Sequence, residues 1–541
     1  MHHLQHIADL GPMLESVGAK HVVIAPGSRN APLIQLFTSA KGFCCHSIVD
    51  ERSAGYVALG MARQLNQPVI VLTTSGTAVL NLSPAVAEAF HQQIPLLVLT
   101  ADRPREIISQ FNNQVTDQRA PYFNHSKGFY EFPVQSRTED GLEGSIRSAE
   151  KLCLEALREP AGPVHLNLPL TEPLYVPLPE PRLSSGRSDS DRELRSTEPA
   201  SNPDIVRDRV RAGTRIMILA GMGKKDAVLE LVLEELLSCQ QAVVVAENIS
   251  NKSSGLFIST PELVIAGASD EELEALTPDL LITFGQQVVS RRLKLLVQSL
   301  KDLEIVELQD AAALPDLLKG LMVPEKIENR FLGKWKEIER REAGRAASYL
   351  QEAAFGNLTA LTRILQNVSS QTVLHLGNSS TVRLSQVLQA RSDLLYYSNR
   401  GTSGIDGSLS SAVGAAMVSG QQHLLILGDL SFVYDSNGLW NKDFPENLKI
   451  VVLNDGGGGI FRLLDGPDQM DFFEEFSVTH HPVSLELLSG AFGRRFARAT
   501  NMEEMEREAE KLYSAASGLS VLEVDTAGSE NSRIFKELFS S

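Results

Sequence analysis

The sequence predicts an α/β protein whose domains are doubly wound parallel sheets. Short apolar runs of strand length alternate with helical patterns through most of the chain, which is typical of parallel α/β domains. Several of these runs end in a carboxylate or a glycine-rich turn, and open α/β sheets place their ligands at that end of their strands. A chain of 541 residues is long enough for two to four domains with sizeable cores.

The first expected domain covers residues 1–180. Its strand-like runs are residues 21–25, 69–73 and 96–100, and it closes near residues 162–169. Residues 181–203 are polar, charged and without periodicity, so they are predicted to be a linker.

Two more α/β domains are expected after this linker. The middle domain covers residues 204–330, with strand-like runs at 215–219, 242–246 and 280–284. Its Gly221-Met222-Gly223 is similar to the start of a dinucleotide-binding loop, but Asp226 stands where a further glycine is required, so nucleotide binding is not expected. A charged helical connector, residues 331–354, leads to the third domain, residues 355–541.

The composition argues against several classes of protein. The formal net charge is -17, and nucleic acids or anionic membranes require a basic surface. No run approaches the roughly 20 apolar residues of a membrane span. The N-terminus has neither the basic region nor the apolar region of a secretory signal, so the cytoplasm is the expected compartment.

The cysteines and vicinal histidines indicate no metal centre of their own. The four cysteines are too few and too scattered for a disulfide framework or a zinc site. Cys44 and Cys45 are interpreted as two small residues on a buried strand. His480 and His481 have no partner at ligand spacing, and they are interpreted as part of a loop.

The interval between Asp429 and Asp455 carries the most specific chemistry. Each aspartate ends an apolar run, and four glycines, Gly456 to Gly459, follow the second. Mg²⁺ prefers oxygen ligands and shares them with phosphate oxygens. Glycines let the backbone approach such a ligand closely. The alternative interpretation of the spacing is a turn-rich crossover in an ordinary α/β domain.

The neighbours of these aspartates resemble the diphosphate–metal motif of thiamine diphosphate enzymes, usually Gly-Asp-Gly followed by Asn-Asn. The resemblance implies thiamine diphosphate with Mg²⁺ or Mn²⁺, held by Asp429, Asp455 and the carbonyl of Gly457. This chain departs from the motif at Leu430 and Asp455. The implied cofactor-binding residues are Glu51, Thr74, Ser75, Gly76, Ser403, Gly404, Ile405, Gly428, Asp429, Leu430, Ser431, Asp455, Gly457, Gly458, Gly459 and Ile460.

Glu51 is the candidate catalytic residue. The three-domain order is similar to that of pyruvate decarboxylase and acetolactate synthase, in which a glutamate of the first domain hydrogen-bonds the aminopyrimidine ring and favours deprotonation of the thiazolium carbon. Glu51 follows the run of residues 44–50, and residues 73–79 also resemble that first domain. Taken alone, the pair Asp50-Glu51 is more often a solvated helix start favoured by the helix dipole. The resemblance implies a homodimer or homotetramer in which Glu51 acts across an interface.

Arginines after several strands point to a more specific family among the thiamine diphosphate enzymes. Residues 25–29, 74–79, 101–104, 398–407 and 458–461 together resemble the 2-succinyl-5-enolpyruvyl-6-hydroxy-3-cyclohexene-1-carboxylate synthases of menaquinone biosynthesis. Guanidinium groups bind carboxylates with paired hydrogen bonds, although each arginine alone is more often structural. The implied substrate-binding residues are Ser28, Arg29, Arg103, Asn113, Gln114, Arg291, Arg292, Ser379, Arg383 and Arg400, with Ile460, Phe461 and Leu464 as an apolar wall. Ile405 would support a bent cofactor.

The implied activity is that of a transferase with two small-molecule substrates. The enzyme would decarboxylate 2-oxoglutarate and add the resulting succinyl-semialdehyde carbanion to isochorismate by conjugate addition. The four carboxylates of these substrates would explain the arginines. One alternative is another thiamine diphosphate-dependent 2-oxo-acid decarboxylase, or an acetolactate synthase-like enzyme. A second alternative, from a different class, is a non-catalytic cofactor-binding protein.

Overall fold

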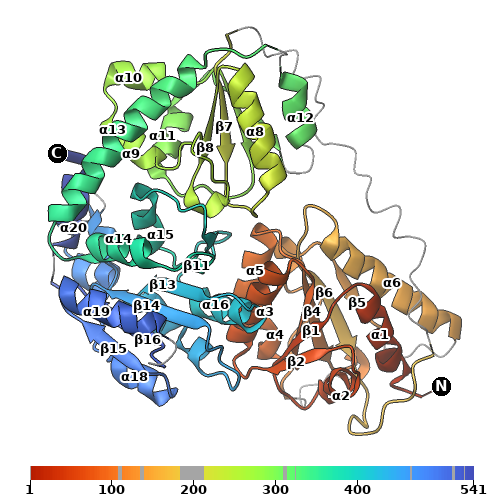
Figure 1. The fold of residues 1–541 in the computed structure, drawn as a ribbon. Helices are drawn as coiled ribbons and strands as arrows, with labels where there is room; N and C mark the ends of the chain where they lie inside the picture. The colour runs from red at the N-terminus through yellow and green to blue at the C-terminus, as the bar shows by residue number, and fades with distance from the viewer. Residues whose placement is uncertain are drawn as a thin grey trace. The chain divides into compact units, whose positions relative to one another are not determined.

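The predicted α/β class is confirmed in a computed structural model. The structure describes residues 2–107, 113–133, 139–182, 213–308, 314–322, 325–463, 466–514, 518–528 and 530–540. Across these residues the strands form three sheets, and every strand pair within them is parallel (Figure 1). The expected linker, residues 181–203, lies outside the described residues from position 183 onward. The proposed domain boundaries therefore stay predictions.

The chain divides into two compact units, which are described separately below. The first unit comprises Met1–Thr197, Asp406–Gly420 and Asp435–Pro445. The second unit comprises Glu198–Ile405, Gln421–Tyr434 and Glu446–Ser541.

The sheet of the first unit has the order β2-β1-β3-β4-β6-β5. Its strands are β1 (His21–Ile24), β2 (Cys44–Ser47), β3 (Val69–Thr73), β4 (Leu96–Asp102), β5 (Phe129–Glu131) and β6 (Val164–Pro169). Every residue of β3, β4 and β6 is buried, as expected for central strands covered on both faces. The edge strand β2 is different, because Cys44 is exposed and Cys45 only half-buried, so the interpretation of this pair as a buried strand was wrong for Cys44.

Helices cover both faces of this sheet (Figure 1). Helices α1 (Gln5–Ser16), α2 (Ala31–Ser39) and α6 (Glu139–Leu157) contribute to an apolar core with residues of β1, β3, β4 and β6. The other helices of the unit are α3 (Glu51–Leu65), α4 (Thr77–Asn81), α5 (Ser83–His91) and α16 (Ser408–Met417).

Helices α3 and α16 pack so closely that their backbones touch. A side chain at Gly60 would overlap the carbonyl oxygen of Ser411, and one at Gly414 would overlap that of Val57. Glycines at these crossing points permit the approach. The hydroxyl of Tyr56 also donates a 2.8 Å hydrogen bond to Asp406. Helix α3, which begins at Glu51, is therefore packed tightly against α16.

The smaller sheet of the second unit has the order β10-β9-β7-β8. Its strands are β7 (Ile216–Ala220), β8 (Ala242–Ala246), β9 (Leu280–Phe284) and β10 (Glu304–Leu308). The helices of this region are α8 (Ala227–Cys239), α9 (Pro261–Gly267), α10 (Asp270–Ala275), α11 (Arg291–Ser299) and α12 (Leu314–Leu321). At Gly221 a side chain would overlap the carbonyl of Gln286, so this glycine permits close backbone packing.

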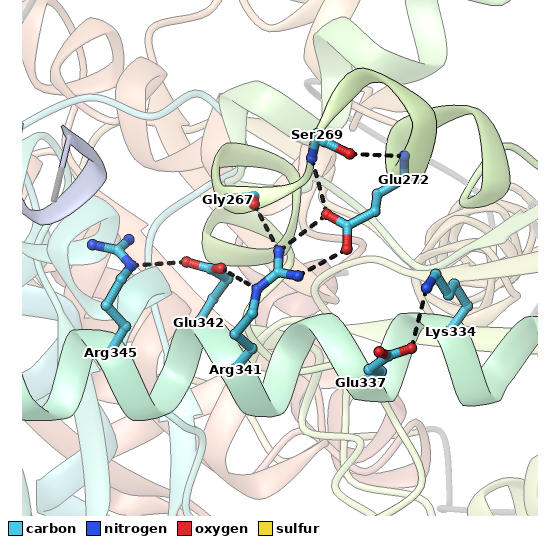
Figure 2. Close-up of polar contacts among 8 residues, drawn as sticks. All are labelled: Gly267, Ser269, Glu272, Lys334, Glu337, Arg341, Glu342 and Arg345. Atoms are coloured by element: carbon cyan, nitrogen blue, oxygen red, sulfur yellow. Dashed lines mark hydrogen bonds and ion pairs between the residues drawn. The ribbon is translucent and has the colours of Figure 1, made fainter.

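Helix α13 (Arg330–Glu352) lies in the region for which a helical connector is predicted. Figure 2 shows Arg341 of α13 between the carboxylates of Glu272 and Glu342, and its guanidinium also donates to the carbonyl of Gly267. Glu272 closes a capping box with Ser269 at the start of α10. Buried Glu342 pairs with both Arg341 and Arg345 of the same helix and so orients Arg341. The contacts of Arg341 with Gly267 and Glu272 then attach α13 to the α9–α10 connection.

The larger sheet of the second unit has the order β12-β11-β13-β14-β16-β15. Its strands are β11 (Val373–Leu376), β12 (Leu395–Tyr397), β13 (His423–Gly428), β14 (Leu448–Asn454), β15 (Phe496–Ala499) and β16 (Val521–Asp525). The accompanying helices are α14 (Asn357–Asn367), α15 (Ser380–Leu384), α17 (Asp429–Tyr434), α18 (Leu485–Ala491), α19 (Met502–Tyr513) and α20 (Asn531–Ser540). Among the described residues, no helix is both long and apolar enough to cross a membrane.

Candidate active site

Asp429 and Asp455 lie at the carboxyl-terminal ends of two neighbouring central strands of the larger sheet. Asp429 follows β13 and begins α17, and Asp455 follows the neighbouring strand β14. The register pairs Gly428 with Leu453, so the two parallel strands end side by side. Burial and, after it, the negative charge of Asp429 raise the pKa of Asp455 to about 7. Burial also raises the pKa of Asp429, although contact with His481 opposes the shift. The site therefore concentrates negative charge that a cation would neutralise.

The glycines after Asp455 are required by close packing. Gly457 has φ +142°, and a side chain there would overlap the carbonyl of Val478. A side chain at Gly459 would overlap the carboxylate of Asp455, whose Oδ2 accepts a 3.0 Å hydrogen bond from Asn357. The backbone thus runs beside the carboxylate without any side chain between them.

This donor set fits a hard divalent cation. Two carboxylates, with the Gly457 carbonyl two residues after Asp455 in the chain, are oxygen ligands of the kind that Mg²⁺ and Mn²⁺ accept. The charge that each aspartate imposes on the other would be compensated by the ion. Asp455 can take the place of the asparagine usual in the motif, because its carboxylate also coordinates through oxygen.

The segment that carries Ser403, Gly404 and Ile405 is tied to this site. The Ser431 hydroxyl of α17 donates a 2.6 Å hydrogen bond to the Ile405 carbonyl. The Asn378 amide donates to the Gly404 carbonyl, also at 2.6 Å. Ile405 keeps 39% of its surface exposed, which leaves its side chain accessible to a ligand. Asn378 is a positioning residue that the sequence patterns did not reveal.

The vicinal histidines also contact the motif. His480 and His481 do lie in a loop, as expected, but His481 Nε2 is 3.0 Å from Asp429 Oδ2. His480 Nδ1 is 2.6 Å from the Gly456 carbonyl. No spacing rule could have found these contacts, because 52 residues separate His481 from Asp429 in the chain.

A pocket of the second unit gathers several of the predicted substrate-binding residues. Its volume is about 280 Å³, and its lining includes Arg291, Arg292, Arg383 and Ile460, together with Glu262, Leu463, Phe535 and Phe539. Glu262 and the aromatic residues of α20 were not expected there. The mixture of cationic and apolar lining suits a ligand with carboxylates on an apolar body.

Lys294 lies near a second group of cations, Arg383 and Arg400. No sequence pattern singled out Lys294. Burial lowers the pKa of Lys294, and the positive charges of Arg400 and Arg383 lower it further, against the carboxylate of Glu247. Glu247 is buried and accepts hydrogen bonds from the backbone N–H groups of Val289 and Ser290, both at 2.6 Å. Burial raises its pKa to about 7. Glu247 thereby holds the loop that leads to Arg291 and Arg292.

In the first unit, Glu51 is the first residue of α3. Asp50 caps this helix by accepting a hydrogen bond from the Ser53 N–H at 3.1 Å. The other oxygen of Asp50 accepts from the Asn437 amide at 2.6 Å. These two hydrogen bonds fix Asp50 and the start of α3, and they therefore fix the backbone position of Glu51.

The loops after β1, β3 and β4 of this unit come together. A side chain at Gly27 would overlap Thr74, so the loop before Arg29 packs against the loop of residues 73–76. The Ser75 hydroxyl donates to the Gln114 carbonyl at 3.0 Å, and the Gln114 amide donates to the Ser75 carbonyl at 3.2 Å. Among the described residues, the buried Thr74 Oγ1 has no hydrogen-bond partner, which suits a polar ligand.

Arg29 and Arg103 share this loop cluster. Burial lowers the pKa of Arg29, and the charge of Arg103 lowers it further. Arg29 donates to the Leu170 carbonyl at 3.2 Å and pairs with Glu172 at 3.1 Å. The Ser28 hydroxyl is 2.9 Å from that of Tyr175. These contacts give Arg29 structural partners, and Arg103 is close enough to lower the pKa of Arg29.

The remaining predicted substrate-binding residues are Ser379, Asn113, Phe461 and Leu464. Ser379 has φ +71° at the start of α15, the helix that carries Arg383. Asn113 is exposed, and Phe461 keeps 39% of its surface exposed beside Ile460. Leu464 lies outside the described residues.

Known proteins resemble this chain along almost its whole length. Family models described as the N-terminal and C-terminal TPP binding domains of thiamine pyrophosphate (thiamine diphosphate) enzymes match residues 7–120 and 377–524. A Desulfotalea psychrophila protein named 2-succinyl-5-enolpyruvyl-6-hydroxy-3-cyclohexene-1-carboxylate synthase is 39% identical, covering 96% of this chain and 98% of its own. Proteins of the same name from Flavobacterium johnsoniae and Porphyromonas gingivalis are 32% and 33% identical, covering 96% and 98% of this chain and 96% of their own. The chain therefore belongs to the 2-succinyl-5-enolpyruvyl-6-hydroxy-3-cyclohexene-1-carboxylate synthase family of thiamine diphosphate enzymes.

Proposed function

We propose that this chain decarboxylates 2-oxoglutarate and transfers the remaining four-carbon unit to isochorismate, in menaquinone biosynthesis. Its family membership supports a transferase that uses thiamine diphosphate. The single observation that supports the substrate class is the pocket with Arg291, Arg292, Arg383 and Ile460 in its lining. Guanidinium groups pair with carboxylates through two parallel hydrogen bonds, and the two substrates carry four carboxylates.

The cofactor would be held by Asp429, Asp455 and Gly457 at its diphosphate and by Glu51 at its aminopyrimidine ring. Asp429, Asp455 and the carbonyl of Gly457 would coordinate Mg²⁺ or Mn²⁺ beside the diphosphate. Thiamine diphosphate, when bound, supplies the electron sink that decarboxylation of a 2-oxo acid requires. Glu51 would hold a proton at its carboxyl group for the aminopyrimidine ring, and a homodimer or homotetramer would place that carboxyl against a second copy's diphosphate site.

The apolar residues would protect the reacting carbon from water. Ile460 lines the pocket, and Phe461 and Leu464 follow it in the chain. Exclusion of water would favour carbon–carbon bond formation over simple protonation. The arginines would orient both substrates through their carboxylates, so that the acceptor ring lies next to the reacting carbon.

The test follows CO₂ release from 2-oxoglutarate in the presence of thiamine diphosphate and Mg²⁺, with and without isochorismate. We expect rapid release only with isochorismate. Replacement of Glu51 by Gln should reduce the rate severely. Glu143→Gln is the matched control, because Glu143 is a surface residue of α6 paired with Arg147, and it should leave the rate unchanged.

Each alternative has its own outcome in this assay. Release that does not depend on isochorismate, or that occurs only from pyruvate, would indicate another 2-oxo-acid decarboxylase or an acetolactate synthase-like enzyme. Binding of thiamine diphosphate without CO₂ release from any 2-oxo acid would indicate a non-catalytic cofactor-binding protein.

A further inference from the structure

Three potential metal ligands lie together on the edge of the first unit's sheet, and none of them is among the residues assigned above. His21 begins β1, and Cys44 and His46 lie on the edge strand β2. The parallel register pairs His21 with Cys44 and Val23 with His46. Because side chains alternate along a strand, His21, Cys44 and His46 point to one face, and Cys45 points to the opposite face, where it packs against the core.

The distances suit a tetrahedral ion. His21 Nδ1 lies 3.2 Å from His46 Nε2, and the rings stack with centroids 5.5 Å apart. Zinc binds imidazole nitrogen at about 2.0–2.1 Å, so two histidine ligands of a tetrahedral site lie about 3.3 Å apart. The Cys44 sulfur completes a group in which all ligand atoms lie within 4.8 Å of one another. Small side-chain rotations would therefore bring all three atoms onto one ion.

The charges around this group are mixed. The Asp443 carboxylate contributes negative charge at His46, and the Lys20 ammonium contributes positive charge at His21. Metal binds the neutral form of imidazole, so the group takes up an ion without first holding protons on both rings. Cys44 is exposed, so an ion can reach the group from solvent.

We propose that His21, Cys44 and His46 form a binding site for a thiophilic transition-metal ion of the Zn²⁺ class, with water in the fourth position. The site differs in chemistry from the one at Asp429 and Asp455. Imidazole and thiolate select Zn²⁺, whereas carboxylates and carbonyls select Mg²⁺. Mg²⁺ at the concentrations that saturate the cofactor site would therefore leave this group available.

The test uses Co²⁺ as a spectroscopic substitute for Zn²⁺. The full chain, saturated with thiamine diphosphate and Mg²⁺ under reducing conditions, is titrated with Co²⁺ and then with competing Zn²⁺. Coordination by Cys44 should give a thiolate-to-cobalt charge-transfer band that one equivalent of Zn²⁺ abolishes. Cys44→Ser should lose the band. His46→Gln and His21→Gln should each weaken Zn²⁺ binding at least about 100-fold, the upper end of the effect of losing an outer-shell partner.

Two matched controls separate this group from its neighbours. Cys45→Ser should keep the band, because Cys45 faces the core. A variant with His2 and His3 replaced by Ala should keep it too, which excludes binding at the N-terminal histidines. Absence of a charge-transfer band, its persistence in Cys44→Ser, or unchanged Zn²⁺ affinity in both histidine variants would overturn the proposal and leave a hydrogen-bonded histidine pair. Thermal unfolding without added metal verifies that each variant is folded.

Discussion

The carboxylate of Glu262 lies 3.3 Å from Nε of Arg292, and the guanidinium of Arg292 also lies over the ring of Phe539, 4.8 Å from its centroid. Glu262 accepts two further hydrogen bonds from the start of α11, from the Ser290 hydroxyl at 2.5 Å and from the Arg292 N–H at 3.2 Å. A proposed substrate-binding arginine is therefore held by residues of α9 and of the C-terminal helix α20.

We expect Glu262→Gln to raise the KM of a substrate more than it lowers kcat, because Arg292 loses the charge that orients it. The side chain of Arg292 is 43% exposed, so solvent screens the pair. We therefore expect the free energy of substrate binding to weaken by about 1 kcal/mol, which raises KM about fivefold. Steady-state kinetics with each substrate measure the effect. Glu271→Gln, an exposed change on α10, should leave KM unaltered.

Lys294→Met should weaken substrate binding while leaving the folded protein at least as stable. Lys294 adds positive charge beside Arg383 and Arg400, so its removal reduces both the attraction for carboxylates and the repulsion among the cations. A KM increase of about three- to tenfold would correspond to about 0.7–1.4 kcal/mol. Lys301→Met provides an exposed lysine control. Unchanged KM values for both substrates would exclude Lys294 from the binding site.

The pH dependence of the free energy of unfolding should reveal the raised pKa of Glu247. Its pKa is raised from 4.5 to about 7, so the folded state holds the proton more tightly than the unfolded state does. Its contribution to stability is therefore greatest below about pH 4.5, falls between pH 4.5 and 7, and is constant above that. In denaturant unfolding, Glu247→Gln should gain stability relative to wild type as the pH rises through this window. A difference that is constant between pH 5 and 8 would contradict the shift.

Asp455→Asn should stabilise the metal-free protein and weaken binding of Mg²⁺. The substitution removes one of two negative charges that raise each other's cost of burial. It also removes a charged oxygen ligand, so we expect affinity for Mg²⁺ to fall about tenfold, or 1.4 kcal/mol. Thermal unfolding without metal and activity titrated with Mg²⁺ test the two parts. Asp471→Asn is an exposed acidic control.

Gly414→Ala should destabilise the first unit by about 1–3 kcal/mol, the usual cost of overpacking. The added methyl group would overlap the Val57 carbonyl at the contact of α3 and α16. Gly420→Ala is the matched control, because no atom lies within 4 Å of a side chain built there. Equal unfolding midpoints for the two variants would contradict this prediction, because the methyl group added at position 414 would then cost no stability.

The sequence determined the α/β class and the ends of the site strands. Local features carry this information, because apolar runs predict strands and a carboxylate after such a run marks the sheet edge where parallel strands end. Strands β8 (Ala242–Ala246) and β9 (Leu280–Phe284) occur at the predicted residues. Asp429 and Asp455 could be paired from sequence because each directly follows its strand.

Tertiary structure decided the contacts between distant segments. His481 reaches Asp429, Phe539 reaches Arg292, and His21 reaches His46, yet no local pattern marks any of these pairs. The exposure of Cys44 likewise depends on strand order, since β2 is at the sheet edge. Strand and helix periods depend on neighbours in the chain, whereas these contacts depend on how whole elements pack, and packing is a property of the complete fold.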